Sequence, residues 1–325
     1  MSAEKSSQLT LNYRAAGQPI PAWVREIIDA HLAIEAEDAQ SAGSLGFMAR
    51  ALVIATMPYK DPKADVFKRQ NGDFRLRIVA GYEGGIPYGI YPRLLTSWVS
   101  TEAVRTRSPV IQLGDCLRTF VRDVMDLRSN GGGPRGSGSR VAEQMKRLFG
   151  SLITAHYTGT QQQRGFVLRN VLIADELQLD DAELTGLWTP QHAEEAGRWK
   201  SQVRLSNGFF RECIENPVPI DLRAYKALRG SPLAMDVYTW LTYRMSYTHR
   251  RTRPIRWEAL MMQFGSDYGT ETAQAVRDFR KAFLKALKLV LVVYSQARVE
   301  VSDAGVVLLP SRIPTLPPPT QRELF

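Results

Sequence analysis

The sequence has 325 residues, with 42 Lys and Arg against 33 Asp and Glu, which gives a formal net charge of +9. Its length is enough for two domains, and 44% of its residues are hydrophobic, which is typical of a folded protein. The excess of cationic residues favours polyanionic partners. The N-terminus lacks a basic stretch followed by an apolar core, and no apolar run reaches the ~18 residues of a membrane span. These features predict a cytoplasmic protein with no membrane association.

Residues that carry catalytic or metal chemistry are sparse. Cys116 and Cys213 lie apart in apolar patterns, which predicts buried hydrophobic side chains and excludes a disulfide or zinc site. The histidines are isolated from one another, so we expect no metal site, no cofactor and no rolling-circle nickase centre. No Ser/His/Asp or Cys/His arrangement is legible, and we expect no catalytic residues. The histidines are His31, His156, His192 and His249.

Residues 1–44 are predicted to form an N-terminal helical segment. Pro21 suits the start of a helix, and an amphipathic pattern runs from Ala22 to Ala39. This helix could pack on the following domain or mediate self-association, and the sequence leaves both open.

Residues 45–200 are predicted to form a first winged-helix domain that ends in an acidic connector. Phe74 to Val79 alternates apolar and basic residues, which indicates a strand, and helices are expected over Arg93–Ser100 and Asp115–Val124. The glycine-rich stretch Ser129–Ser139 lacks the Lys-Ser/Thr of a phosphate-binding loop, so we interpret it as a flexible turn. Helix, turn, helix and β-ribbon is the order of a winged helix.

A helix from Ser139 to about His156 is expected to carry the DNA contacts of this first domain. Arg140, Gln144, Arg147 and Ser151 fall on one flank of the predicted helix, opposite its apolar residues. Arg suits guanine or phosphate and Gln suits adenine, so Arg140, Gln144 and Arg147 are candidate DNA-binding residues.

Residues 201–312 are predicted to form a second winged-helix domain. A helix begins at Pro232, an arginine-rich run follows from Tyr247 to Arg256, and a short helix leads to Phe264. Leu289–Tyr294 is expected to be a strand, and further strands are expected over Arg298–Ser302 and Val306–Leu309.

The stretch Thr270–Lys288 is the predicted recognition helix of that domain. At about 100° per residue one side is apolar, with Val276, Phe279, Phe283 and Leu287, and the opposite side is cationic. A cationic face alone is also typical of an ordinary solvated helix. The arginine-rich run beside it favours DNA, and the candidate DNA-binding residues of the domain are Arg250, Arg251, Arg253, Gln274, Arg277, Lys281, Lys285 and Lys288.

The run SPLAMDVYTWLTYR at residues 231–244, preceded by PVPIDLRAYKALR at 217–229, resembles the C-terminal region of RepA-type plasmid replication initiators. The resemblance is close over 203–310 and looser over 47–175. It implies two winged-helix domains in tandem that bind direct repeats at a plasmid origin, without a catalytic centre. It also implies recruitment of the host initiator and helicase, and a dimer that represses its own promoter.

Residues 313–325 form a Pro-rich tail, which is expected to be an extended spacer. Its last five residues, QRELF, look like the peptide by which bacterial proteins bind the polymerase sliding clamp. Leu324 and Phe325 would be the apolar anchors and Gln321 would donate and accept orienting hydrogen bonds. A frayed terminus without function is the alternative.

The sequence therefore predicts an α+β protein with two tandem winged-helix DNA-binding domains, an N-terminal helix and an extended Pro-rich C-terminal tail. The predicted function is initiation of plasmid replication, by binding direct repeats in duplex DNA at the origin and promoting local opening of the duplex. The expected partners are origin repeats, a second copy of the chain, the host initiator and helicase, and the clamp. The alternatives are a dimeric winged-helix transcriptional repressor without a replication role, and a nucleic-acid enzyme such as a nickase or primase.

Overall fold

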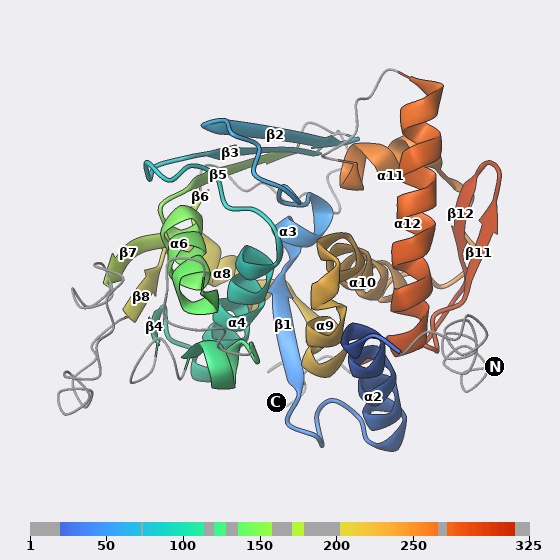
Figure 1. Ribbon diagram of the computed structural model, residues 1–325, viewed down its shortest axis with the longest axis horizontal. Coiled ribbons are helices and arrows are strands. Elements are labelled where there is room, and N and C mark those ends of the chain that lie inside the picture. Colours follow the sequence, from blue (N-terminus) through green and yellow to red (C-terminus); the bar gives the residue numbers. More distant parts are fainter. Residues whose placement is uncertain are drawn as a thin grey trace, which may run out of the picture. The chain divides into compact units, whose positions relative to one another are not determined.

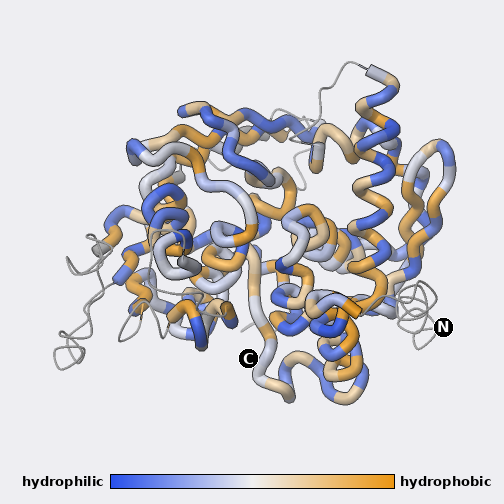
Figure 2. Tube along the Cα trace, viewed as in Figure 1, coloured by the Kyte–Doolittle hydropathy of each residue, from blue (hydrophilic) through white to orange (hydrophobic). Residues whose placement is uncertain are grey.

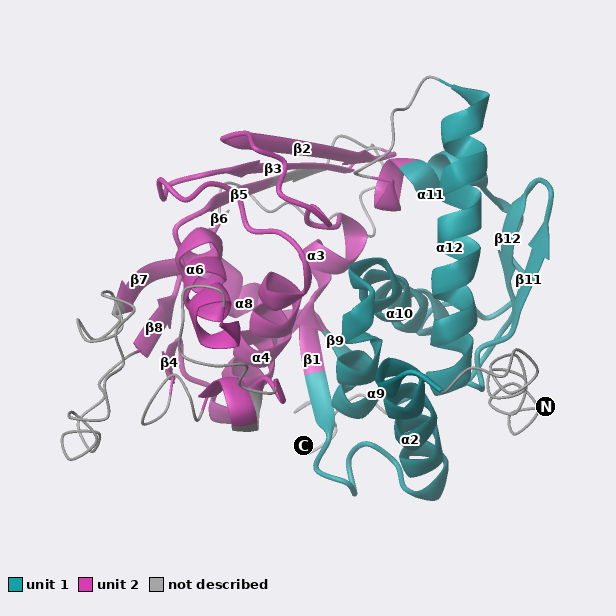
Figure 3. Ribbon diagram, viewed as in Figure 1, with its two compact units in different colours: residues 1–46, 218–261, 269–325 teal, residues 47–217, 262–268 magenta. Residues whose placement is uncertain are grey.

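The computed structural model describes residues 20–72, 74–113, 120–127, 136–157, 171–178, 202–265 and 272–315. The chain divides into two compact units, shown in Figure 3. Unit 1 contains residues 1–46, 218–261 and 269–325, and unit 2 contains residues 47–217 and 262–268. Both units mix helices with antiparallel strands, so the α+β prediction is confirmed. The predicted domain boundaries remain a prediction.

Unit 2 contains two sheets, with strand orders β2-β3-β5-β6 and β4-β8-β7 (Figure 1). In β3 the side chains of Phe74, Leu76 and Ile78 are buried, and Arg75 and Arg77 between them are exposed. This confirms the strand that the alternating pattern predicts. The elements are α3 (Arg50–Ile54), β2 (Val66–Asn71), β3 (Phe74–Val79), α4 (Ile90–Thr106), β4 (Val110–Gln112), a π-helical turn (Phe120–Val124), α6 (Ser137–Phe149), β5 (Leu152–Tyr157), β6 (Val171–Leu172), β7 (Ala174–Gln178), β8 (Gln202–Leu205) and α8 (Asn207–Glu215).

Unit 1 contains helices from both ends of the sequence and a three-stranded sheet of order β10-β12-β11. Three elements cross the sequence boundaries between the units: the strands β1 (Leu45–Ala49) and β9 (Pro217–Asp221), and the helix α11 (Trp257–Phe264), whose last three residues belong to unit 2. The other elements are α2 (Ala22–Ala36), α9 (Leu222–Ala227), a 3-10 turn (Leu228–Gly230), α10 (Pro232–Met245), β10 (Ile255–Arg256), α12 (Ala273–Val293), β11 (Val299–Ser302) and β12 (Gly305–Leu308).

Two predicted elements are wrong in part. The helix expected over Ser139–His156 ends at Phe149, and β5 follows it, because the backbone of Leu152–Tyr157 pairs with β3. The strand expected over Leu289–Tyr294 is instead the last part of α12. Val290, Val292 and Val293 are buried there, so core packing outweighs the β preference of this apolar run.

The core of unit 1 is built around Phe283 of α12. Its ring centroid lies 6.3 Å from that of Trp240, 6.0 Å from Trp257 and 5.7 Å from Phe279. The first two pairs are near perpendicular, which aromatic rings prefer over a face-to-face stack. This cluster fixes which side of α12 faces the interior.

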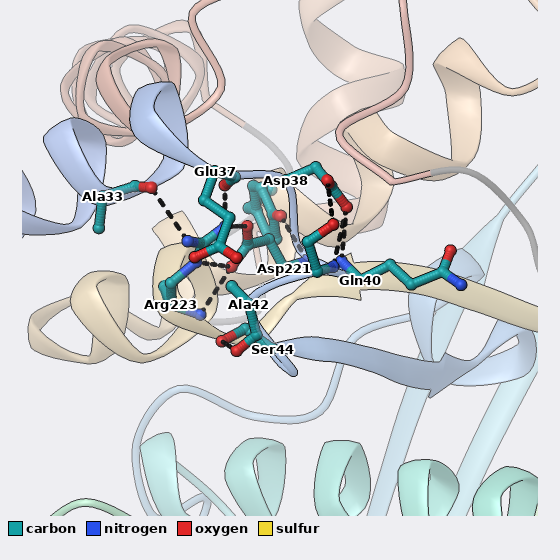
Figure 4. A network of polar contacts seen from close by, with 10 residues as sticks. Ala33, Glu37, Asp38, Gln40, Ala42, Ser44, Asp221 and Arg223 are labelled. Carbon is teal, nitrogen blue, oxygen red and sulfur yellow. Dashed lines mark hydrogen bonds and ion pairs between the residues drawn. The ribbon is translucent and has the colours of Figure 1, made fainter.

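The helix α2 is tied into unit 1 by a network centred on Arg223 (Figure 4). The Arg223 guanidinium donates hydrogen bonds to the carbonyl oxygens of Ala33 (3.0 Å) and Glu37 (2.8 Å). It also donates to both carboxylate oxygens of Asp221, at 3.1 and 2.7 Å. The Ala33 carbonyl oxygen thereby gains a second donor besides the Glu37 N–H, and the Glu37 carbonyl oxygen, just past the end of α2, gains a donor from Arg223.

Candidate nucleic-acid interface

The helix α12 presents a cationic face in unit 1. Thr272 caps its start, because the Thr272 hydroxyl accepts a hydrogen bond from the Ala275 N–H at 3.1 Å. From there the helix carries five cations and one carboxylate, Asp278. Apolar and polar residues alternate along it, as Figure 2 shows by colour. A helix with this pattern buries one side and offers the other to solvent.

Burial confirms the two faces that the sequence predicts for this helix. Phe279, Phe283 and Leu287 are buried. Arg277, Lys281, Lys285 and Lys288 are exposed. At a rise of 1.5 Å per residue, the four cations span about 16 Å along the helix axis. They form a row of positive charge that can follow the phosphates of a duplex.

The cations of this face differ in their surroundings. The Arg277 guanidinium donates two hydrogen bonds to Gln274 Oε1, at 3.2 and 2.8 Å, and the Gln274 amide donates to Asp278. Arg277 and Gln274 are therefore oriented together. Within the described residues, no hydrogen bond or ion pair engages the ammonium groups of Lys281, Lys285 and Lys288. These three are free to bind an external anion.

Arg280, which the sequence analysis did not select, connects α12 to the ribbon of β11 and β12. Its guanidinium lies 2.9 Å from the Asp303 carboxylate at the ribbon turn and 5.1 Å from the Trp257 ring centroid. The Trp257 indole N–H donates to the Ser302 carbonyl oxygen at 3.3 Å. Its position between the buried and cationic sides of the helix is the sequence signal that could have identified Arg280 as a bridge.

The arginine-rich run lies next to the same ribbon. Arg250 and Arg253 are exposed. Arg251 pairs with Glu300 of β11 at 2.6 Å, in an exposed ion pair. The predicted trio is thus divided, since Arg251 already has a carboxylate partner and its charge is partly neutralised.

In unit 2 the predicted DNA-binding residues of α6 do not all lie on an exposed flank of the helix. Arg140 is exposed, as expected. Gln144 is only 5% exposed, and its side-chain oxygen accepts a hydrogen bond from the Tyr88 N–H at 2.9 Å. Ser151 is buried and lies beyond the helix, just before β5. The shared outer flank predicted for these residues is therefore wrong.

Arg147 also makes its contacts within unit 2. It pairs with Glu143 at 2.9 Å and with Asp61 at 3.4 Å, and its guanidinium lies 5.2 Å from the Tyr88 ring centroid. Burial lowers the pKa of Arg147, but its hydrogen bond and charge pairing with Glu143 outweigh that effect and raise the pKa. Gln144 and Arg147 both hold α6 to the segment around Tyr88, which the spacing of the helix alone could not reveal.

Other chemistry is sparse in the part of the chain that the structure describes. No three His, Cys, Asp or Glu side chains gather there as metal ligands would. Cys213 is fully buried, as predicted, and burial raises the pKa of its thiol to about 12. No described helix combines the length and apolar character needed to cross a membrane. Cys116 and the predicted clamp-binding residues Gln321, Leu324 and Phe325 lie outside the described residues.

Comparison with known proteins connects this arrangement to one family. Residues 86–259 match the family described as plasmid encoded RepA protein. The match covers more than half of the chain and includes α6, α10 and the arginine-rich run. No curated protein matches, and no solved structure matches.

Proposed function

Because the chain belongs to the family of plasmid-encoded RepA proteins and is a plasmid replication protein, we propose that it initiates replication by binding direct repeats at a plasmid origin. The observation that carries the proposal is the cationic face of α12. Lys281, Lys285 and Lys288 project from a helix fixed by its buried aromatic side, so the row of charge is held rigidly. Such a row binds phosphates and releases their counterions.

We propose that α10, α11 and α12 with β10, β12 and β11 form a winged helix. The order helix, strand, helix, helix and two-stranded ribbon supports this, as does the pairing of β10 with β12 and of β12 with β11. In this arrangement α12 is the recognition helix and enters the major groove. The ribbon turn at Asp303, held by Arg280, lies against the backbone.

The contacts divide into two classes by their chemistry. Lys281, Lys285 and Lys288, with Arg250 and Arg253, bind phosphates and supply affinity without sequence information. Arg277 and Gln274 at the start of α12 select bases, since Arg suits guanine and Gln suits adenine. Adjacent repeats filled in this way would bend the duplex and promote its local opening, with protein contacts offsetting the deformation energy.

In unit 2 we propose a second winged helix in which Arg140 contacts DNA. Gln144 and Arg147 act there by holding α6 in place, which their contacts with Tyr88 support. Recruitment of the host initiator and helicase, and repression of its own promoter by the dimer, complete the proposed role. The chain acts as a binding protein in the cytoplasm, without catalytic residues, metal or cofactor.

Two other functions give different experimental results. A dimeric winged-helix repressor would prefer one inverted repeat, whereas an initiator prefers a tandem array of direct repeats. A nickase would convert a supercoiled origin plasmid to the open circular form in the presence of Mg²⁺. A nicked product in that assay would exclude the proposal.

Footprinting on the DNA that flanks its own gene tests the proposed function directly. The Lys281→Ala plus Lys285→Ala variant removes two unpaired cations, so we expect weaker binding to all sequences and a salt slope lower by about two. The matched control is Arg25→Ala plus Arg312→Ala, which removes two exposed cations of unit 1 that are not part of α12. Equal protection of the repeats by both variants would contradict the role of α12.

A further inference from the structure

The four-stranded sheet of unit 2 carries a second cationic surface, on the exposed face of β2 and β3. Lys68 of β2 lies directly opposite Arg77 of β3, and Gln70 lies opposite Arg75. All four side chains are exposed. Figure 1 shows β2, β3 and β5 side by side. In the pairing of β3 with β5, Arg77 is in register with Thr154. We call Lys68, Arg75 and Arg77 the sheet cations.

The fold fixes this face towards solvent. Successive residues of a strand point to opposite faces, and Phe74, Leu76 and Ile78 of β3 are at most 4% exposed on the other face. Any shift of register by one residue would bury the arginines, so the sheet cations have no alternative orientation.

The sheet cations are placed at a cost to stability. Side chains directly opposite on adjacent strands lie about 5 Å apart at Cβ, and like charges in such a pair destabilise a sheet. Within the described residues, no hydrogen bond or ion pair engages the side chains of Lys68, Arg75 or Arg77. An anion from outside the chain would relieve the repulsion between Lys68 and Arg77.

We propose that the sheet cations bind the phosphate backbone of duplex DNA, as a contact surface additional to the cationic face of α12. The proposal rests on the proposed function and extends it to a strand pair that precedes residues 86–259, the part of the chain that matches the family. A second copy of the chain would bring the same cations together, whereas DNA brings the opposite charge. The phosphate contacts would position unit 2 on DNA without reading sequence.

The other end of the same face differs in chemistry. Val66, Val79, Leu152 and Leu172 follow one another across the four strands, and Val66 and Leu172 are 36% and 40% exposed. This apolar row would suit a protein, and an acidic protein partner is the competing occupant of the face. The three unpaired cations favour DNA, and the experiment separates the two.

The test compares two double variants that remove the same charge from unit 2. Lys68→Gln plus Arg77→Gln removes two sheet cations. Arg105→Gln plus Arg204→Gln removes two exposed cations that already pair with carboxylates, those of Glu102 and Glu176. The affinity of the full-length chain for the duplex that flanks its gene, and for an unrelated duplex of equal length, is measured across a salt series by fluorescence anisotropy.

We expect the sheet variant to lower the salt slope by about two on both duplexes, relative to the control variant. Its thermal midpoint should equal or exceed that of the wild type, because the repulsion between Lys68 and Arg77 is gone. If the midpoint falls instead, the single variant Arg75→Gln replaces the double variant in the binding assay. Arg75 lies opposite the neutral Gln70, so this change does not alter the Lys68–Arg77 pair. That variant should lower the slope by about one.

Each result separates this proposal from the proposed function. A sheet variant with the slope of the control overturns the sheet contact, and an acidic protein partner on this face would give that result. A wild-type chain that binds neither duplex would instead refute the proposed function. Weak binding by Lys281→Ala plus Lys285→Ala together with an unchanged sheet variant leaves α12 as the contact and removes the sheet.

Discussion

At the scale of single residues, Arg223 shows how one side chain holds a helix in unit 1. The Asp221 side chain is 1% exposed and Arg223 is its partner, while the same guanidinium satisfies two carbonyl groups at the end of α2. The hydrogen bond to Asp221 is the main cause that raises the pKa of Arg223. A planar guanidinium with five N–H donors can make all these contacts, and an ammonium cannot.

We therefore expect Arg223→Ala to lower the free energy of unfolding by about 3 kcal/mol, because it leaves the Asp221 carboxylate buried and unpaired. Arg223→Lys keeps the charge but loses the fork, so its stability should lie between those of Arg223→Ala and the wild type. Urea denaturation measures both. A loss below about 0.5 kcal/mol for Arg223→Ala would show that the network is dispensable.

Glu212 gives unit 2 a dependence on pH. Its side chain is 4% exposed and lies 3.6 Å from the Arg50 guanidinium. Burial raises the pKa of Glu212 to about 7 from its ordinary 4.5, although Arg50 opposes the shift. The folded protein therefore binds a proton that the unfolded chain releases between these values. Its contribution to stability is complete below about 4.5, falls as pH rises towards 7 and is level above that.

The measurement is the stability of Glu212→Gln relative to the wild type across that pH window. The amide cannot ionise, so the difference should change by about 2 kcal/mol in favour of the variant between pH 4.5 and 7. Glu83→Gln, which alters an exposed carboxylate of the same unit, is the control and should show no such trend. A parallel pH profile for wild type and Glu212→Gln would contradict the assignment.

At the scale of elements, the sequence patterns succeed where one face is buried and one is exposed. The alternation at Phe74–Val79 and the two faces of α12 follow from local periodicity, and both are present. Patterns fail where an apolar run suits either state. Residues 289–293 could form a strand or a helix, and only the packing of Val290 and Val293 into the core decides for the helix.

Gly305 allows β12 to lie close enough to β10 for the two strands to pair. Its φ is +148°, and a Cβ at this position would lie 2.0 Å from the Ile255 carbonyl oxygen. Gly305→Ala should separate β10 from β12 and lower the free energy of unfolding by about 2 kcal/mol or more. Hydrogen exchange at Arg256 and Val306 would report the lost pairing.

Gly230→Ala is the matched control for this change. A Cβ at Gly230 meets nothing within 4 Å, so its effect should stay within about 0.5 kcal/mol. Equal stability of the two alanine variants would mean that the ribbon tolerates movement of β10, and the fixed wing of the proposed function would lose its support.

At the scale of the whole molecule, the sequence does not reveal which segments of the chain make up each unit. Local patterns predict α2, but they do not reveal that it packs with α9 and α12 in one unit. The same limit applies to Gln144 and Arg147, whose partners Tyr88 and Asp61 are far away in the sequence. Contacts of this kind depend on tertiary structure, and helical spacing gives no information about them.

The last five residues of the sequence, QRELF, carry a prediction of their own, because they follow both candidate DNA-binding regions in the sequence. Deleting residues 321–325 should abolish binding to the polymerase sliding clamp and leave origin binding unchanged, because Leu324 and Phe325 are the expected anchors. Arg322→Ala plus Glu323→Ala keeps Gln321 and both anchors, so it should retain clamp binding. Binding of the wild type, the deletion and the double variant to surface-immobilised clamp tests this. Equal affinity with and without the last five residues would refute the prediction.

The division of unit 1 between distant parts of the sequence has a consequence during synthesis. The ribosome completes α2 long before α12, because all of residues 47–217 lie between them. At about 5–20 residues per second, α2 waits about ten seconds or longer for its partners, with Val24 and Ile27 uncovered. The nascent chain therefore gains its α12 surface only after nearly the whole polypeptide has been made, so a chain released early lacks the surface to which we assign recognition of the origin.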